Sequence, residues 1–202
     1  VTRRMWLKLW PGLPEDEIPI GHITNGIHVP SWLSAENVAL LNRYLGPDWR
    51  KHPDSKDVLR HVADIPDEEL WRAHDLGRSR LVRRTREFLE KQMRARNATP
   101  AEVGQAKGVL DHDTLTIGFA RRFAAYKRAT LLLRHPERLH ALLTNEEQPV
   151  QIIFAGKAHP ADDRGKELIR QIVQFAHKNN LRHRLVFLEN YDMYIARSLV
   201  HG

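Results

Sequence analysis

The sequence contains no cysteine. Disulfide bonds and thiolate metal sites are therefore excluded, and the composition agrees with a reducing compartment. No apolar run approaches the ~18–20 residues that a membrane-spanning helix needs, and the N-terminus lacks the basic and apolar layout of a signal peptide. We therefore expect a cytoplasmic chain with no membrane partner.

Several ligand-binding motifs are missing as well. Neither G-x-x-x-x-G-K-[ST] nor G-x-G-x-x-G occurs, so nucleotide hydrolysis and dinucleotide binding both lose support. His22 and His28 flank an Asn-Gly pair, but a metal site would need a third ligand and no His-Glu-x-x-His cluster supplies one. We expect no metal here, and interpret residues 21–32 as a polar loop with an aromatic, suited to sugar stacking or to tertiary packing.

What the chain does contain is ordinary globular composition, with 202 residues, 42% hydrophobic and 28% charged. It begins Val1-Thr2-Arg3-Arg4 without an initiator Met and stops at Gly202, directly after an apolar helix-like stretch. This pattern predicts an internal piece of a longer protein.

The charge is strongly positive, +7 with a pI of about 9.9, which indicates an anionic partner. Arginines crowd into residues 78–96, where they alternate with apolar side chains. That spacing fits the solvated face of a long amphipathic helix, and a nucleic-acid patch is the alternative. We favour the helix and expect no nucleic-acid partner.

Residues 1–112 read as loop followed by helices. Residues 1–33 are rich in Pro, Gly and Trp, which break any periodicity. Ser34 is an N-cap candidate for a short helix that ends at Gly46. Pro66 and the acids after it open a long helix to about residue 95, with an inward stripe of Leu70, His74, Leu81 and Phe88, and Thr99 begins another helix.

After residue 112 the pattern changes to strands alternating with helices. Apolar runs occupy residues 114–120, 150–155 and 185–188, and helical spacing occupies 125–143, 162–179 and the stretch from 193. Short, almost wholly apolar strands between helices indicate a parallel sheet covered on both faces. The predicted fold class is α/β, with a partial doubly wound parallel sheet in 113–202 preceded by a helical and loop segment in 1–112.

Polar residues follow each predicted strand. Cations at Arg121, Arg122, Lys127 and Arg128 follow the first, Gly156 and Lys157 the second, and Glu189 and Asn190 the third. Because the carboxyl ends of parallel strands share one edge, these residues should converge, and Arg forks beside a helix start suit phosphate oxygens. The alternative, that they are solvated helix-start residues and loop caps, stays open at this point.

Four segments, in order, resemble the α-glucan phosphorylases, pyridoxal-phosphate enzymes of the glycosyltransferase-B architecture. Residues 22–27 resemble the T-N-G-I segment of that family, 121–128 its K-R-I-H-E-Y-K-R, 156–158 its G-K-A and 187–191 its F-L-E-N-Y. The resemblance implies that residues 113–202 form the first half of the C-terminal Rossmann-like domain. It places residues 1–112 in the N-terminal domain and the interdomain region.

The resemblance also implies residue roles. Arg122 and Lys127 match the family's catalytic, phosphate-handling Arg and Lys. The implied cofactor-binding residues are Arg121, Tyr126 and Tyr191, and the implied substrate-binding residues are Asn25, Gly156, Lys157, Glu189 and Asn190. Two positions depart from the animal-type motif, since Ala124 replaces a His and Asp192 replaces an Arg.

The activity implied is transfer of terminal glucosyl units of α-1,4-glucan to inorganic phosphate, giving glucose 1-phosphate, with pyridoxal 5'-phosphate as cofactor. In the family, the Schiff-base lysine lies in a Gly-Thr-Gly-Asn-Met-Lys type segment, which this chain lacks. We therefore expect the chain alone to be inactive, and to self-associate through an open sheet edge. The alternatives are a sugar-nucleotide glycosyltransferase of the same fold and a basic module that binds anionic polymers.

Overall fold

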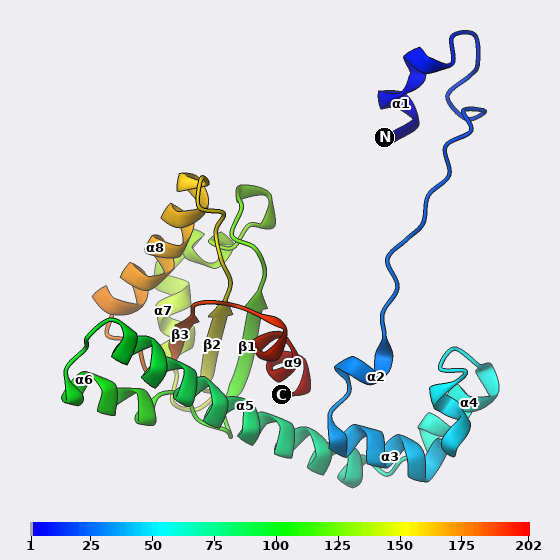
Figure 1. Cartoon of the computed structure of the whole chain (residues 1–202). Coiled ribbons are helices and arrows are strands. Elements are labelled where there is room, and N and C mark those ends of the chain that lie inside the picture. The colour runs from blue at the N-terminus through cyan, green and yellow to red at the C-terminus, as the bar shows by residue number, and fades with distance from the viewer. Residues whose placement is uncertain (1) are drawn as a thin grey trace.

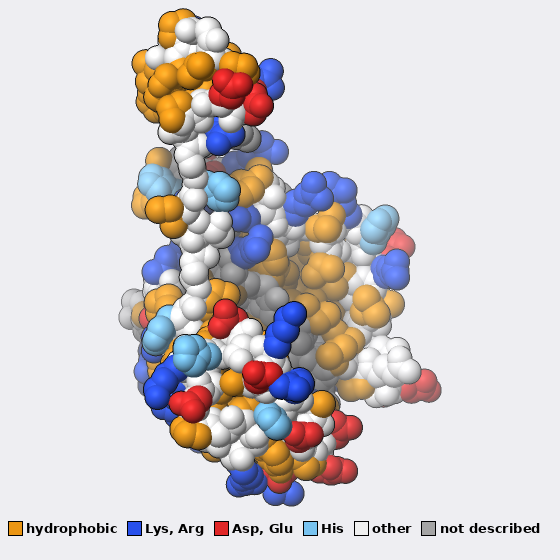
Figure 2. Space-filling view, turned by 90° about the vertical axis from the view of Figure 1, so that its right-hand side faces the viewer, with side chains coloured by type: hydrophobic (Ala, Val, Ile, Leu, Met, Phe, Trp, Pro, Cys, Tyr) orange, Lys and Arg blue, Asp and Glu red, His pale blue; other side chains and the backbone are white. Residues whose placement is uncertain are grey.

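The computed structural model describes residues 2–202. Figure 1 shows an α/β body and, apart from it, an N-terminal segment that contains α1 (Thr2–Met5) and a 3-10 turn (Leu7–Leu9). An extended stretch leads from there to α2 (Val29–Trp32), and Figure 2 shows it as a narrow connection below a cap of hydrophobic side chains. No helix in the described part of the chain is both long and apolar enough to cross a membrane.

The helical segment starts with α3 (Ala35–Leu45) and continues through α4 (Lys56–Arg60), α5 (Asp67–Ala95) and α6 (Pro100–Gln105), with 3-10 turns at Pro47–Arg50, His61–Asp64 and Ala106–Gly108. The predicted cap is confirmed, because the Ser34 hydroxyl accepts a hydrogen bond from the Asn37 amide at 3.1 Å. Thr99 and Glu102 form a capping box that starts α6. The helices predicted from Ser34, Pro66 and Thr99 are therefore present.

The sheet has three parallel strands in the order β1-β2-β3. They are β1 (Leu115–Ala120), β2 (Val150–Ala155) and β3 (Leu185–Leu188), which match the three predicted apolar runs. Phe154 of β2 pairs with Phe119 of β1 and Phe187 of β3, so the three rings lie in one row across the sheet. The predicted α/β fold class is confirmed.

Helices cover both faces of the sheet. Alternate residues of β2 and β3 contribute to two separate cores, as side chains of a strand must. One core lies under α7 (Pro136–Thr144) and α8 (Asp163–Lys178) and includes Ile152 and Phe154. The other lies under α5 and α9 (Met193–His201) and includes Ile153 and Ala155. Burial on both faces explains why β2 and β3 read as continuous apolar runs, whereas β1 stays partly exposed, with Leu115 62% exposed.

The prediction of one helix over residues 125–143 was wrong for the first half of that range. Two 3-10 turns, Ala125–Lys127 and Leu131–Arg134, precede α7, which starts at Pro136. The physical reason lies at Arg128, whose φ of 56° is left-handed and stops a helix, and at Pro136, which occupies the first turn of α7.

The inward stripe predicted for α5 holds only for its later part. Leu81 and Leu89 are buried, but Leu70 is 50% exposed and His74 is exposed. Close packing begins further along the helix, where a side chain at Gly77 would clash with the His201 carbonyl oxygen of α9. Leu70 and Trp71 in the first turns of α5 are therefore only partly covered, at 50% and 61% exposed.

The arginines of residues 78–96 are engaged within the chain. Arg86 donates to the carbonyl oxygens of Val109 and Leu110, both at 2.8 Å, and Arg84 donates to the Ser198 hydroxyl at 3.1 Å. The remaining arginines pair with carboxylates, namely Arg78 with Asp75, Arg80 with Glu36, Arg83 with Glu87, Arg94 with Glu90 and Arg96 with Glu189. This pattern favours the amphipathic helix over a nucleic-acid patch.

The pair between Glu36 and Arg80 joins α3 to α5 and gives a pH-dependent prediction. Hydrogen bonding to Arg80 lowers the pKa of Glu36 from 4.5 to about 2. A lowered carboxyl pKa stabilises the fold above pH 4.5, and this contribution is lost as the pH falls through about 2. Because both side chains are partly exposed, Glu36→Gln should lower the free energy of unfolding at pH 7 by only about 1–2 kcal/mol.

Urea unfolding at pH 7 and pH 3 measures this effect, and the difference between Glu36→Gln and wild type should shrink at the lower pH. Glu87→Gln is the control, since its pair with Arg83 is 3.9 Å long and well exposed. An equal loss of stability in both variants at pH 7 would contradict the assignment.

Candidate anion-binding site

The helices change faces of the sheet beside β1. α7 and α8 lie on one face, whereas α9 follows β3 and crosses the opposite face to lie against β1. There, a side chain at Gly118 would contact Leu199 of α9. Ligands of open α/β sheets bind at the carboxyl ends of the strands, at the point where the direction of winding reverses. The carboxyl end of β1 is therefore the candidate site, at the top of the sheet in Figure 1.

Residues 121–128, here called the arginine loop, follow β1 directly. The Arg121 amide donates to the Ala155 carbonyl oxygen at 3.2 Å, and the Phe123 amide donates to the Lys157 carbonyl oxygen at 2.9 Å. These bonds fix the loop against the stretch that follows β2. Two of the three predicted strand ends, those of β1 and β2, are thus brought together by the backbone.

Phe123 anchors the arginine loop in the core. Its side chain is 0% exposed and packs edge-to-face on Phe119, with ring centroids 5.8 Å apart, and on Phe187 at 5.4 Å. Its neighbours Arg121 and Arg122 are both exposed. A single buried aromatic therefore holds two exposed guanidinium groups at the edge of the sheet.

The packing of Phe123 requires a glycine at position 156. A side chain at Gly156 would clash with the Arg121 carbonyl oxygen and with the Phe123 ring, and its φ is not in the left-handed region. Gly165, near the start of α8, is equally tight against the Phe123 carbonyl oxygen. The two glycines thus permit close approach of the arginine loop, which is a packing requirement and needs no special backbone conformation.

The cations at this edge are free of acidic partners. Within residues 2–202, no ion pair joins Arg121, Arg122, Lys127, Arg128 or Lys157 to a carboxylate, whereas five of the seven arginines of residues 78–96 pair with one. Lys127 is half-buried and its Nζ lies 4.6 Å from the ring centroid of Tyr126, a cation–π contact. Lys and Arg side chains gather toward the upper end of the α/β body in Figure 2.

At the third strand end, several polar residues already have partners within the chain. Glu189 forms an ion pair with Arg96 of the segment after α5, and Asn190 is exposed with a left-handed φ of 54°. Tyr191 is half-buried against the core under α5. Asp192, which departs from the animal-type motif, accepts a hydrogen bond from the Ile195 amide at 2.9 Å and caps α9.

Asn25 does not join this site. Residues 21–28 are all exposed and form neither helix nor strand, and in Figure 1 the stretch runs apart from the sheet. Its predicted role in substrate binding stays a prediction.

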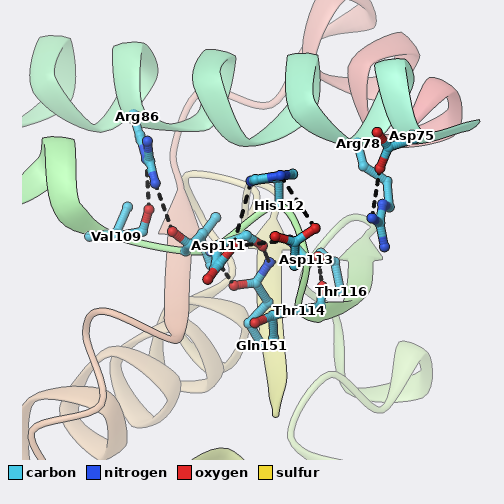
Figure 3. Close-up of polar contacts among 11 residues, drawn as sticks. Asp75, Arg78, Arg86, Val109, Asp111, His112, Asp113, Thr114, Thr116 and Gln151 are labelled. Atoms are coloured by element: carbon cyan, nitrogen blue, oxygen red, sulfur yellow. Dashed lines mark hydrogen bonds and ion pairs between the residues drawn. The ribbon is translucent and has the colours of Figure 1, made fainter. Parts of the chain in front are cut away.

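A separate polar cluster lies at the opposite end of β1, just before the strand begins. Asp111, His112 and Asp113 could offer ligand atoms to a metal ion, the single such group found among residues 2–202 (Figure 3). All three are exposed, and His112 lies 3.3 Å from Asp113 and 3.6 Å from Asp111. Below them, buried Gln151 donates to the Asp111 carbonyl oxygen and to the Thr116 hydroxyl, so the turn is held by internal hydrogen bonds.

Comparison with proteins of known sequence gives the family of the chain. The profile of the carbohydrate phosphorylase family matches residues 13–202. The chain belongs to this family. It is 43% identical to the maltodextrin phosphorylase of Thermococcus litoralis, 44% to a glycogen phosphorylase of Mycobacterium tuberculosis and 40% to a glycogen phosphorylase of Aquifex aeolicus. Each match covers the whole chain but only 24%, 23% and 29% of the relative, so this phosphorylase sequence spans about a quarter of their length.

Sequence reasoning missed some residues that shape the candidate anion-binding site. Phe123 stood inside a cationic stretch, and its apolar character was the only local signal of an anchor. Gln92 and Arg96 contact the third strand end from α5 and the segment after it, across more than 90 residues. No short motif links positions so far apart, so these contacts could only come from the folded structure.

Proposed function

We propose that this chain is part of an α-glucan phosphorylase, which transfers terminal glucosyl units of α-1,4-glucan to inorganic phosphate and releases glucose 1-phosphate. The supporting observation is the arginine loop, which presents cations without acidic partners at the point where the winding of the sheet reverses. Relatives named glycogen or maltodextrin phosphorylase match the whole chain, which supports the same reaction.

In this reaction the chain's residues hold and orient phosphate. A proton of the phosphate passes to the glycosidic oxygen, the bond from that oxygen to the anomeric carbon breaks, and a phosphate oxygen bonds to this carbon. The leaving glucan keeps the proton as a hydroxyl. Arg122 can bind two phosphate oxygens with its planar fork, while Lys127 supplies a compact charge, and both stabilise the negative charge that the phosphate gains on losing its proton.

Pyridoxal 5'-phosphate belongs to the same proposal. Its phosphate group, when bound, supplies a proton-transfer partner for inorganic phosphate. The chain fits that group, because Arg121 is exposed without an acidic partner among residues 2–202 and Tyr126 of the same loop is 72% exposed. Tyr191, half-buried on the third strand end, is the remaining proposed contact. The resemblance places the Schiff-base lysine outside this sequence, so the chain would hold only part of the cofactor.

The other residues assigned to the site differ in their contacts. Lys157 and Asn190 are exposed at the carboxyl edge of the sheet and stay candidates for substrate binding. Gly156 has a packing role, and Glu189 is already paired with Arg96. The boundary between residues 1–112 and 113–202 stays a prediction, as do the cytoplasmic location and self-association through an open sheet edge.

The proposal is tested with the purified chain. Inorganic phosphate should bind and shift the side-chain NMR resonances of Arg121 and Arg122, whereas maltodextrin plus phosphate should yield no glucose 1-phosphate, because the covalent cofactor anchor is missing. Arg122→Ala should abolish most of the phosphate response, and Arg83→Ala should not. Release of glucose 1-phosphate would contradict the expected inactivity, and a wild-type chain that does not respond to phosphate would contradict the anion site.

A further inference from the structure

The side chain of Gln92 makes the hydrogen bonds to β3 that a neighbouring strand would otherwise make. Gln92 is half-buried near the C-terminal end of α5. Its Nε2 donates to the Phe187 carbonyl oxygen at 3.2 Å, and its Oε1 accepts from the Glu189 amide at 2.9 Å. β3 is an edge strand within the described chain, so these two backbone groups would otherwise lack a partner from the sheet. One amide therefore closes the outer edge of β3 where the strand ends.

Arg96 makes a second contact at the same place. It forms an ion pair with Glu189, the residue whose amide Gln92 binds. The Arg96 side chain is 62% exposed, so this pair is screened by water and contributes less than the two hydrogen bonds of Gln92. Gln92 is thus the principal contact to the end of β3 from this side.

The end of β3 is in turn packed against the arginine loop. The Phe187 ring lies 5.4 Å from the ring of Phe123, which anchors that loop. The Leu188 carbonyl oxygen accepts from the Gly156 amide at 3.3 Å, and Gly156 lies directly against the Arg121 carbonyl oxygen. A shift of the backbone at residues 187–189 would therefore reach Arg121 and Arg122 through two separate sets of contacts.

We propose that Gln92 is a positioning residue for phosphate binding, acting on Arg121 and Arg122 by fixing the carboxyl end of β3. This inference rests on the proposed function, since it assigns a role toward the phosphate that the arginine loop would hold. Gln92 itself does not touch the ligand. Without its hydrogen bonds, Phe187 and Glu189 would leave two backbone groups unpaired, and the strand end could move away from Phe123 and Gly156.

The test compares Gln92→Met, which keeps the side-chain volume and removes both hydrogen bonds, with Gln171→Met, a matched change at an exposed position of α8. In Gln92→Met, amide exchange at Glu189 should accelerate about tenfold, the usual size of losing one partly buried hydrogen bond. Inorganic phosphate should bind about three- to tenfold more weakly, at a temperature where both variants are fully folded. The Arg121 and Arg122 side-chain resonances should shift even without phosphate.

Each result decides a separate point. Unchanged exchange at Glu189 would overturn the contact itself. Faster exchange with unchanged phosphate affinity and unchanged arginine resonances would show a purely structural residue and overturn the positioning role. If the wild-type chain binds no phosphate, the proposed function fails, and the arginine resonances of Gln92→Met still show whether the end of β3 controls the arginine loop. Gln171→Met should match wild type in every measurement.

Discussion

Under the proposed function, replacing Arg122 or Lys127 by Ala in the longer phosphorylase should lower kcat/KM for phosphorolysis by about 30- to 1000-fold each, the usual effect of removing one preorganised electrostatic group. Phosphate carries crowded negative charge as its proton leaves, and the structure offers these cations no other anion among residues 2–202. The concentration of phosphate needed for half-maximal rate should rise as well. Initial rates at varied phosphate concentration, at constant maltodextrin, measure both effects.

Conservative substitutions that keep the positive charge should also lower the activity at Arg122 and Lys127. Arg122→Lys keeps the charge but loses the bidentate fork, so it should recover only part of the activity. Lys127→Arg should also recover only part of the activity, because it replaces the compact ammonium held over the Tyr126 ring by a larger planar group of different reach.

The control for this prediction is Arg83→Ala. Its side chain is 70% exposed on α5 and has only a 3.9 Å pair with Glu87, so its loss should change the rate by less than about twofold. Equal damage from Arg83→Ala and Arg122→Ala, or an unchanged phosphate dependence in Arg122→Ala, would remove the anion site from the arginine loop.

Phe123→Ala should lower the free energy of unfolding of the chain by about 3–5 kcal/mol, among the largest effects expected of any single substitution here. The side chain is 0% exposed and lies between Phe119 and Phe187, so truncation would leave a cavity between the loop and the sheet. Phosphate affinity should fall too, because Arg121 and Arg122 would lose their anchor. Urea unfolding followed by circular dichroism measures the first effect and phosphate titration the second.

Two further variants keep this prediction testable. Phe123→Leu should fold and lose about 1–2 kcal/mol, which covers the case in which the alanine variant does not fold. Tyr126→Ala removes an aromatic of similar size from the same loop, but that ring is 72% exposed, so stability should change by less than about 0.5 kcal/mol. Comparable destabilisation from Tyr126→Ala and Phe123→Leu would argue against Phe123 as the anchor.

The strands could be predicted from their apolar runs, and in β2 and β3 these runs reflect burial on both faces of the sheet. A strand such as Leu185–Leu188, buried at every position, has no polar residue to interrupt its apolar run. The prediction of a helix was wrong over the first half of residues 125–143, because nothing in Tyr126-Lys127-Arg128 indicates a left-handed φ at Arg128. Local composition specifies burial more directly than it specifies backbone conformation at single residues.

The site could be predicted only in part. Cations after β1 and a Gly-Lys pair after β2 lie at one edge because parallel strands place their carboxyl ends together, and this follows from the pattern alone. The partner of Glu189 could not be foreseen, since Arg96 is one of several nearby arginines that are equivalent in sequence. Asn25, matched by a motif, lies on an exposed stretch that no described element holds against the sheet.

The contacts of Gln92 also bear on the order in which the chain folds. They join residues 95 and 97 positions apart, so they can form only after β1, β2 and the helices between them have brought β3 back to α5. Closing so long a loop costs conformational entropy that local helix formation does not, and contacts of this kind form late in folding. Recovery of phosphate binding during refolding should therefore lag behind recovery of helical circular dichroism.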